Sequence, residues 1–293
     1  MPAPKVWLDY DQAELDRQYD QRSIVPNGDD YKAGDAKASE VARRELTCRL
    51  DVPYGGNEDE TIDLFPAKAP GAPILVFLHG GAWTRGKKSN ESFLAPGLVA
   101  AGAAVAMPEF TLCPKGTLAG MVAQCRKAVA WVHAHAREMN GDAAHIVIAG
   151  HSSGSHLASM LAVTDWTAEG LPADVLKGCV ITSGIYDLEP VRRSYRNGYV
   201  FLDDAGVESL SPIRHLRPGL PPVRLYYGGL ELAEFRRQGR EFADALKAAG
   251  IDVQAEDLPG LNHFEMGRRL ADRTGPVHLA ALELLRLKVP AAA

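Results

Sequence analysis

Residues 146–157 read IVIAGHSSGSHL, an apolar β-branched run that ends in small, hydroxyl-bearing residues. Such a run is typical of a strand buried on both faces of a sheet. Gly150 and Gly154 bracket Ser152 in the spacing Gly-x-Ser-x-Gly. Glycines there allow a sharp strand-to-helix turn that holds the serine hydroxyl at the N-terminus of a helix. The stretch predicts a nucleophilic Ser152, and the alternative is an ordinary tight turn.

Strand and helix patterns alternate on both sides of this turn. We expect strands at 46–52, 61–65, 73–78, 103–107, 145–149, 179–183, 223–227 and 253–258. Helical patterns fall near 121–132, from 155, at 233–249 and at 277–287. Strands that alternate with helices form mostly parallel sheets covered on both faces. The chain is therefore expected to be an α/β protein with a mostly parallel eight-stranded sheet flanked by helices on both faces.

Two segments stand apart from this alternation. Residues 1–45 are expected to form a polar leader, with a helix near 13–21, packed on or over a main domain of residues 46–293. Residues 189–222 form a long stretch rich in Pro and Arg. Loops of that length in compact domains usually have a function or carry small helices of their own. We therefore expect a lid or a pocket wall around 189–222.

Composition excludes several classes of partner. The chain has 293 residues and a net charge of −5, which gives no reason to expect nucleic acid or an anionic membrane surface. No apolar run approaches the roughly 18–20 residues that span a bilayer, and the N-terminus is too polar for a signal peptide. The four cysteines are scattered, which favours a reducing compartment. A cytoplasmic protein is expected.

A nucleophilic serine needs backbone donors for the oxyanion. The segment His79-Gly80-Gly81-Ala82-Trp83 directly follows the apolar run that ends at Leu78. Its glycines leave the backbone N–H groups of Gly80 and Gly81 unshielded, and the N–H of Ser153 would complete the oxyanion hole. The alternative is a simple Gly-Gly turn.

The base and the acid should follow later strands, in the order serine, acid, histidine. His263, in LPGLNHF after the last expected strand, is the predicted base. Glu231, after the strand that precedes it, is the predicted acid that orients His263. Asp187, in GIYDLEP, is the competing acid.

The remaining titratable residues suggest no metal site. His133 and His135 are two positions apart on an expected helix, so they do not share a face. No metal and no cofactor are therefore expected. His151 and His156 are expected to be pocket walls or packing residues. The arginines of the 189–222 segment could meet a substrate carboxylate, although a solvated loop is the default interpretation; they are Arg192, Arg193 and Arg196.

Several segments together resemble the serine-dependent kynurenine formamidases of the α/β-hydrolase superfamily. They are ELDRQYDQRSIVP, HGGAW, GHSSGSHL, SGIYDLEP, EFRRQGREFADAL and LPGLNHF. The resemblance implies a nucleophile at Ser152, a base at His263 and an acid at Glu231. It also implies oxyanion donors at Gly80, Gly81 and Ser153. Two departures exist: the acid is Glu where the family often has Asp, and MPEFTLCP replaces a stretch that often contains Tyr.

The resemblance implies hydrolysis of an aryl formamide such as N-formylkynurenine, through an acyl-enzyme and without a cofactor. Trp83, His151 and Tyr186 would then contact the aromatic amine. The alternative is a carboxylesterase that acts on short-chain or aromatic esters or on other aromatic amides. A non-catalytic receptor on the same scaffold and a metal-dependent amidohydrolase are rival classes. The expected partner is a small aromatic amide or ester, and the closing helix could support a homodimer.

Overall fold

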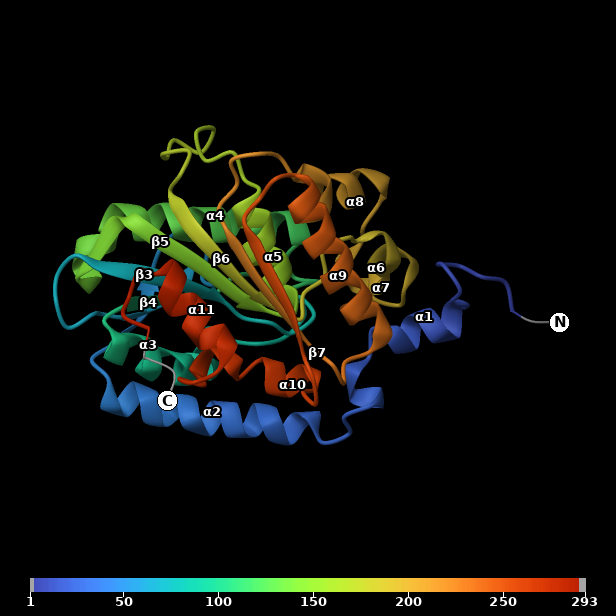
Figure 1. The fold of residues 1–293 in the computed structure, drawn as a ribbon, viewed down its shortest axis with the longest axis horizontal. Helices are drawn as coiled ribbons and strands as arrows, with labels where there is room; N and C mark the ends of the chain where they lie inside the picture. Colours follow the sequence, from blue (N-terminus) through green and yellow to red (C-terminus); the bar gives the residue numbers. More distant parts are fainter. Residues whose placement is uncertain (1–2, 290–293) are drawn as a thin grey trace.

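The computed structural model describes residues 3–289 and contains an eight-stranded sheet (Figure 1). The strands are β1 (Arg49–Pro53), β2 (Thr61–Phe65), β3 (Ala72–Leu78), β4 (Ala104–Pro108), β5 (Gly141–His151), β6 (Leu176–Thr182), β7 (Val223–Gly228) and β8 (Val253–Leu258). Their order is β1-β2-β4-β3-β5-β6-β7-β8. β2 pairs antiparallel with β1 and with β4, and the other pairs are parallel. This confirms the predicted mostly parallel α/β sheet.

Helices cover both faces of the sheet because the central strands are apolar on both faces. Ile74 and Val76 of β3 pack in one buried cluster with α4 (Leu118–His135), α5 (Ser153–Ala162) and α9 (Ala233–Ala248). Leu75 and Phe77 pack in a second cluster with α3 (Ala95–Ala101) and α11 (Pro276–Leu284). Alternate residues of one strand thus belong to opposite faces, as strand geometry requires.

The leader forms α1 (Gln12–Gln18), a short 3₁₀ turn (Gln21–Ser23) and α2 (Gly28–Glu45). The sequence pattern did not predict α2, which runs along one side of the molecule (Figure 1). Its buried residues are small or polar, so no apolar stripe marks the helix. Instead, α2 is held by polar contacts: buried Asp35 accepts from Arg268 at 2.6 Å, and Ser39 Oγ accepts the N–H of Phe93 at 3.1 Å.

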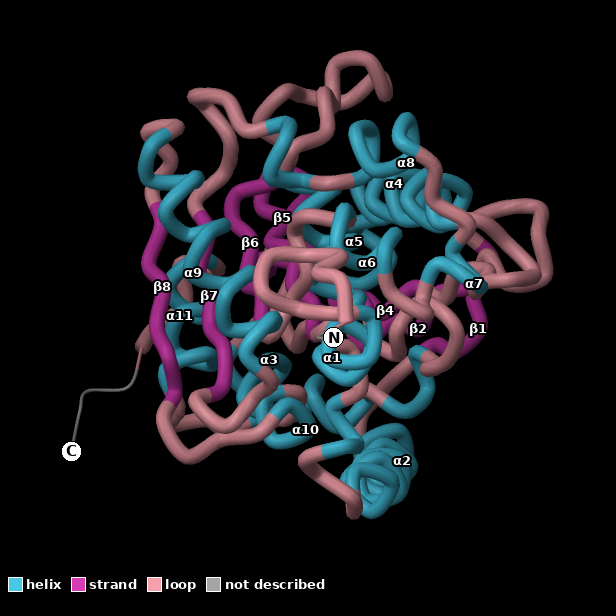
Figure 2. Tube along the Cα trace, turned by 90° about the vertical axis from the view of Figure 1, so that its right-hand side faces the viewer, coloured by secondary structure: helices cyan, strands magenta, loops and turns pink. Residues whose placement is uncertain are grey.

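The segment 189–222 forms α6 (Glu189–Arg193), α7 (Asn197–Val200), α8 (Asp204–Leu210) and a 3₁₀ turn (Pro212–His215). It packs against the leader, although the two are nearly 180 residues apart (Figure 2). The Asp16 carboxylate accepts the N–H of Tyr195 at 2.7 Å, and Gln12 donates to the carbonyl of Arg193 at 2.9 Å.

None of the helices between residues 3 and 289 combines the length and the apolar character that crossing a membrane requires.

Candidate active site

Ser152 lies at the turn between β5 and α5, with φ 57° and ψ −125°. This left-handed conformation is unusual for a serine, and the turn is fixed from both sides. The N–H of Ser152 donates to the carbonyl of Thr182 at 2.9 Å. A Cβ at Gly154 would lie 2.0 Å from the carbonyl oxygen of Leu78, and one at Gly150 would lie 2.3 Å from that of Gly154. The two glycines are therefore required by close backbone approach.

His263 and Glu231 meet Ser152 in one hydrogen-bonded line. The Ser152 hydroxyl donates to Nε2 of His263 at 3.0 Å, and Nδ1 of His263 donates to Oε2 of Glu231 at 3.3 Å. His263 opens α10 (His263–Met266), whose N-terminus is capped by Asn262 in a capping box with Glu265. All three side chains of the line are almost completely buried. A serine activated by an oriented base is the arrangement that nucleophilic catalysis uses.

The acid position is occupied by Glu231 and not by Asp187. The carboxylate of Asp187 accepts the N–H of Glu189 at 3.0 Å and lies 3.4 Å from Arg214. The carboxylate of Glu231 also accepts from the hydroxyl of Ser183 and, at 3.0 Å, from the N–H of Gly228. Sequence reasoning missed Ser183. Its position directly after β6, at the carboxyl edge of the sheet, was the available signal.

The loop after β3 supplies free backbone donors beside Ser152. Within the described chain, the N–H groups of Gly80, Gly81, Ala82 and Ser153 have no hydrogen-bond acceptor, whereas that of Trp83 donates to Ser153 Oγ at 3.3 Å. A Cβ at Gly80 would lie 2.7 Å from the carbonyl oxygen of His151, so the loop directly contacts the turn. Ala82, with φ 54°, was not among the predicted donors.

His79 holds this loop in place through two hydrogen bonds. Its Nε2 donates to Glu109 at 2.7 Å and its Nδ1 donates to the carbonyl of Gly80 at 2.9 Å. Burial by itself lowers the pKa of His79, but the hydrogen bond and charge of Glu109 outweigh burial, and the pKa is raised. Because a trans peptide directs its C=O and N–H oppositely, fixing the Gly80 carbonyl also fixes the direction of the Gly81 N–H.

A cavity of about 250 Å³ opens beside Ser152 and His263. The leader and the main domain both form its walls. The leader contributes Tyr19, Asp20, Gln21, Arg22, Asp29 and Lys32; the main domain contributes Gly80, Gly81, Ala82, Arg85, Gly86, Asn90, Glu91, His151, Ser152, Arg196, His263 and Phe264. No leader residue was assigned to the site from the sequence, because nothing in the local pattern of a polar helix indicates what it covers.

The three residues expected to contact an aromatic amine have different positions. His151 lines the cavity, and its ring centroid lies 4.8 Å from that of His263. Burial, and then the charge of His263, hold the pKa of His151 well below its usual range, so its imidazole is neutral near pH 7.

The expectation for Trp83 and Tyr186 is wrong, because neither side chain lines the cavity. The indole of Trp83 is buried behind the wall and donates to His156 at 3.3 Å. Tyr186 is buried and stacks on Phe242, with ring centroids 4.2 Å apart. The aromatic side chains on the cavity wall are those of Tyr19 and Phe264.

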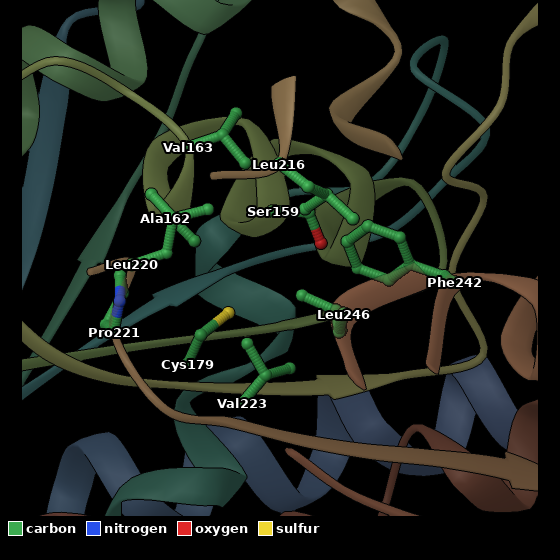
Figure 3. Close-up of a pocket in the computed structure, with 10 residues that line it drawn as sticks. All are labelled: Ser159, Ala162, Val163, Cys179, Leu216, Leu220, Pro221, Val223, Phe242 and Leu246. Carbon is green, nitrogen blue, oxygen red and sulfur yellow. The ribbon is translucent and has the colours of Figure 1, made fainter. Parts of the chain in front are cut away.

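A second cavity lies between α5, β6, β7 and α9 (Figure 3). Its volume is about 10 Å³, and mostly apolar side chains surround Ser159 and Cys179. That space holds at most one water molecule, so it is a packing gap rather than a substrate site. In the described part of the chain, no three His, Cys, Asp or Glu side chains are grouped closely enough to hold a metal ion.

Comparison with known proteins places the chain among amide and ester hydrolases. The BD-FAE family matches residues 62–183. A kynurenine formamidase of Danio rerio is 32% identical, over 91% of this chain and 94% of its own length. A kynurenine formamidase of Salmo salar is 31% identical, over 95% and 97%. Esterase LipQ of Mycobacterium tuberculosis is 28% identical, over 79% and 61%.

Solved structures agree on the fold. A putative thioesterase from Silicibacter superposes with a TM-score of 0.79 at 30% identity, covering 90% of this chain and 97% of that one. Esterase B from Lactobacillus rhamnosis superposes with a TM-score of 0.71 at 18% identity, covering 91% and 94%.

Proposed function

The chain belongs to the kynurenine formamidase family of α/β-hydrolases, and from this premise we propose that it hydrolyses an aryl formamide through Ser152, His263 and Glu231. At the coarser level, the protein is an amide or ester hydrolase. The observation that carries the finer proposal is the hydrogen-bonded line from Ser152 Oγ through His263 to Glu231. The relatives that cover nearly the whole chain support the choice of a formamide.

In the first half-reaction, Ser152 Oγ attacks the formyl carbon while Nε2 of His263 takes the hydroxyl proton. Glu231 accepts the hydrogen bond from Nδ1 and stabilises the imidazolium that forms. The carbonyl oxygen becomes an oxyanion. The free N–H groups of Gly81, Ala82 and Ser153, together with that of Gly80, are the available donors for it.

The tetrahedral intermediate then collapses. His263 gives its proton to the leaving nitrogen, the carbon–nitrogen bond breaks, and the amine departs. The formyl group remains as an ester on Ser152. Water attacks this ester while Nε2 of His263 takes a proton from it. The bond between the formyl carbon and Oγ then breaks, and His263 returns the proton to Oγ. The products are the free serine hydroxyl and formic acid, which ionises to formate. Every transferred proton thus passes through Nε2 of His263, while Nδ1 keeps its own proton in the hydrogen bond to Glu231.

Steady-state kinetics on N-formylkynurenine and on p-nitrophenyl acetate test this proposal, with the wild type and Ser152→Ala. We expect kcat/KM for the formamide to exceed that for the activated ester. We also expect Ser152→Ala to lower turnover of both substrates by at least about 10³-fold, because the nucleophile is lost. Wild-type turnover by Ser152→Ala would overturn the assignment of the nucleophile.

A carboxylesterase is the second candidate function, since the relatives also include proteins named esterase. The same residues would carry it, because triad chemistry does not separate formamides from esters. Ester turnover by the wild type with no turnover of N-formylkynurenine would favour this alternative. The proposed roles of Ser152, His263 and Glu231 would then stand with a different acyl donor.

A further inference from the structure

A buried arginine without a carboxylate partner lies on the wall of the cavity beside Ser152. Arg196, at the start of α7, is only 6% exposed. Its Nη2 donates to the carbonyl of Tyr19 at 2.5 Å. Its Nε and Nη1 are buried and have no hydrogen-bond partner among residues 3–289. The sequence favoured a solvated position for this residue, and the structure corrects that.

Burying an unpaired guanidinium is unfavourable, because the charge loses its hydration and the free N–H groups lose their acceptors. The aromatic rings of Tyr19 and Trp83 compensate in part, since their centroids lie 5.0 and 5.9 Å from the guanidinium carbon. A ring face attracts the charge but leaves Nε and Nη1 without acceptors. Buried polar groups without partners are rare, and on the wall of a cavity a ligand is one source of the missing acceptor.

Two of the other three lysine and arginine side chains on the cavity wall have carboxylate partners, unlike Arg196. Arg22 pairs with Asp29 at 2.5 Å, and Lys32 lies 3.6 Å from Asp35 and 3.8 Å from Glu91. Only one further cavity cation resembles Arg196 in having no carboxylate within 4 Å in the described chain. It is Arg85, an exposed residue whose N–H donates to the carbonyl of Gly81.

Arg85 and Arg196 both line the cavity beside Ser152. Burial raises the pKa of Tyr199 to about 12, while the charges of Arg196 and Arg85 both act to lower it. The cavity wall carries four cationic side chains against three carboxylates. In the described chain, Arg85 and Arg196 have no carboxylate partner, and among the carboxylates Asp20 has no cationic partner and accepts only the N–H of Arg22 at 3.1 Å. The cavity is therefore suited to an anionic ligand.

We propose that Arg196, assisted by Arg85, binds a carboxylate carried by the substrate. A carboxylate presents two acceptor oxygens to the planar fork of an arginine and would supply the negative charge that the guanidinium of Arg196 lacks among the described residues. A formyl group carries no carboxylate, so the anionic group belongs to the amine part of the substrate. This placement rests on the proposed formamidase function. The substrates are then formamides of aromatic amines that bear a carboxylate, and neutral formanilides are poor substrates.

Two matched pairs of substrates test the inference. The formamide pair is N-formylkynurenine and 2-acetylformanilide, which lacks the amino-acid group. The ester pair is 3-carboxyphenyl acetate and phenyl acetate, which differ in one carboxylate on the leaving group. The variants are Arg196→Met, which keeps an apolar stem without charge, and Arg196→Lys, which keeps the charge without the planar fork. Arg192→Gln is the control, because Arg192 belongs to the same segment and pairs with Glu189 and Asp204.

We expect Arg196→Met to lower kcat/KM for the carboxylate-bearing member of each pair about 10- to 100-fold, mainly through KM. The neutral members should change less than about 3-fold, Arg196→Lys should fall between, and Arg192→Gln should match the wild type. Equal losses on charged and neutral members, or no loss at all, would overturn the inference.

The ester pair keeps this result separate from the proposed function. If the wild type cleaves neither formamide but still prefers 3-carboxyphenyl acetate in an Arg196-dependent way, the formamidase proposal fails and the carboxylate site stands. Circular-dichroism melting of each variant identifies a loss caused by unfolding, and Arg196→Lys then provides the decisive comparison.

Discussion

One backbone conformation, that of Ser152, links the fold to the proposed chemistry. A serine with φ 57° and ψ −125° is strained by roughly 1–3 kcal/mol and persists only where its surroundings hold it. The hydrogen bond to Thr182 and the contact with Gly80 provide that support. In this conformation the hydroxyl lies 3.0 Å from Nε2 of His263.

The choice between two acidic residues is also decided at the scale of single residues. We expect Glu231→Gln to lower kcat about 10²- to 10⁴-fold, because a neutral amide neither stabilises the imidazolium nor selects the tautomer of His263. Asp187→Asn should leave kcat within about 3-fold of the wild type, since Asp187 binds Arg214 instead. Stopped-flow or steady-state assays on p-nitrophenyl acetate measure both. The reverse ranking of the two variants would contradict the assignment of the acid.

At the scale of elements, the strand-turn-helix unit of β5 and α5 depends on close backbone contact with β3. Gly154→Ala should destabilise the fold by about 3 kcal/mol or more, since its Cβ would meet the backbone oxygens of Leu78 and His79 at 2.0 and 2.7 Å. Urea denaturation measures this change.

Gly198→Ala is the matched control for this prediction. Gly198 is exposed in α7, and a Cβ there would meet no atom within 4 Å. Its replacement should be neutral or stabilise the fold by up to about 1 kcal/mol. A Gly154→Ala variant as stable as this control would contradict the prediction, because it would show that the turn can accommodate a Cβ at this position.

The leader and the segment 189–222 act together as elements that complete the cavity. Tyr19 belongs to the leader, Arg196 belongs to the other segment, and the carbonyl of Tyr19 accepts from Arg196. Neither element could form this wall alone. The segment was predicted as a lid or pocket wall from its length, whereas the role of the leader follows from contacts between positions far apart in the sequence.

At the scale of the whole molecule, His156 joins three separate parts of the chain. It lies in α5, its Nδ1 accepts from Trp83 of the loop after β3, and its Nε2 donates to the carbonyl of Leu210 at 2.8 Å. Protonation would place a second N–H against the indole N–H. Burial lowers the pKa of His156 to about 4.

Stability should therefore depend on pH through His156. The unfolded chain binds this proton near pH 6.5, but the folded protein does not until about pH 4. This contribution to stability is complete above pH 6.5 and is lost as the pH falls toward 4. Between pH 7 and pH 5, we expect the unfolding free energy of the wild type to fall by about 2 kcal/mol more than that of His156→Gln.

Urea titrations at pH 7, 6 and 5 measure this difference, and the other titrating groups are shared by the two proteins. His133→Gln, a change at a partly exposed position in α4, is the control and should follow the wild type. Parallel pH profiles for the wild type and His156→Gln would contradict the prediction.

The sequence by itself predicted the sheet, the strand-to-helix turn at Ser152 and the base His263, and it favoured Glu231 over Asp187 as the acid. These features depend on local patterns: apolar runs for the strands, glycines at the turns, and polar residues directly after strands that end at one edge. Thr61–Phe65 and Val253–Leu258 coincide with the predicted strands.

Only the tertiary structure decided which residues surround Ser152, His263 and Glu231. Helix α2 lacks an apolar stripe, so its docking through Asp35 could not be inferred from periodicity. Trp83 and Tyr186 are buried away from the cavity, whereas Arg196, expected in solvent, lies on its wall. The physical reason is that a cavity is formed by side chains from distant segments. The packing of those segments sets the burial and the pairing of the side chains. Local sequence patterns do not indicate how distant segments pack.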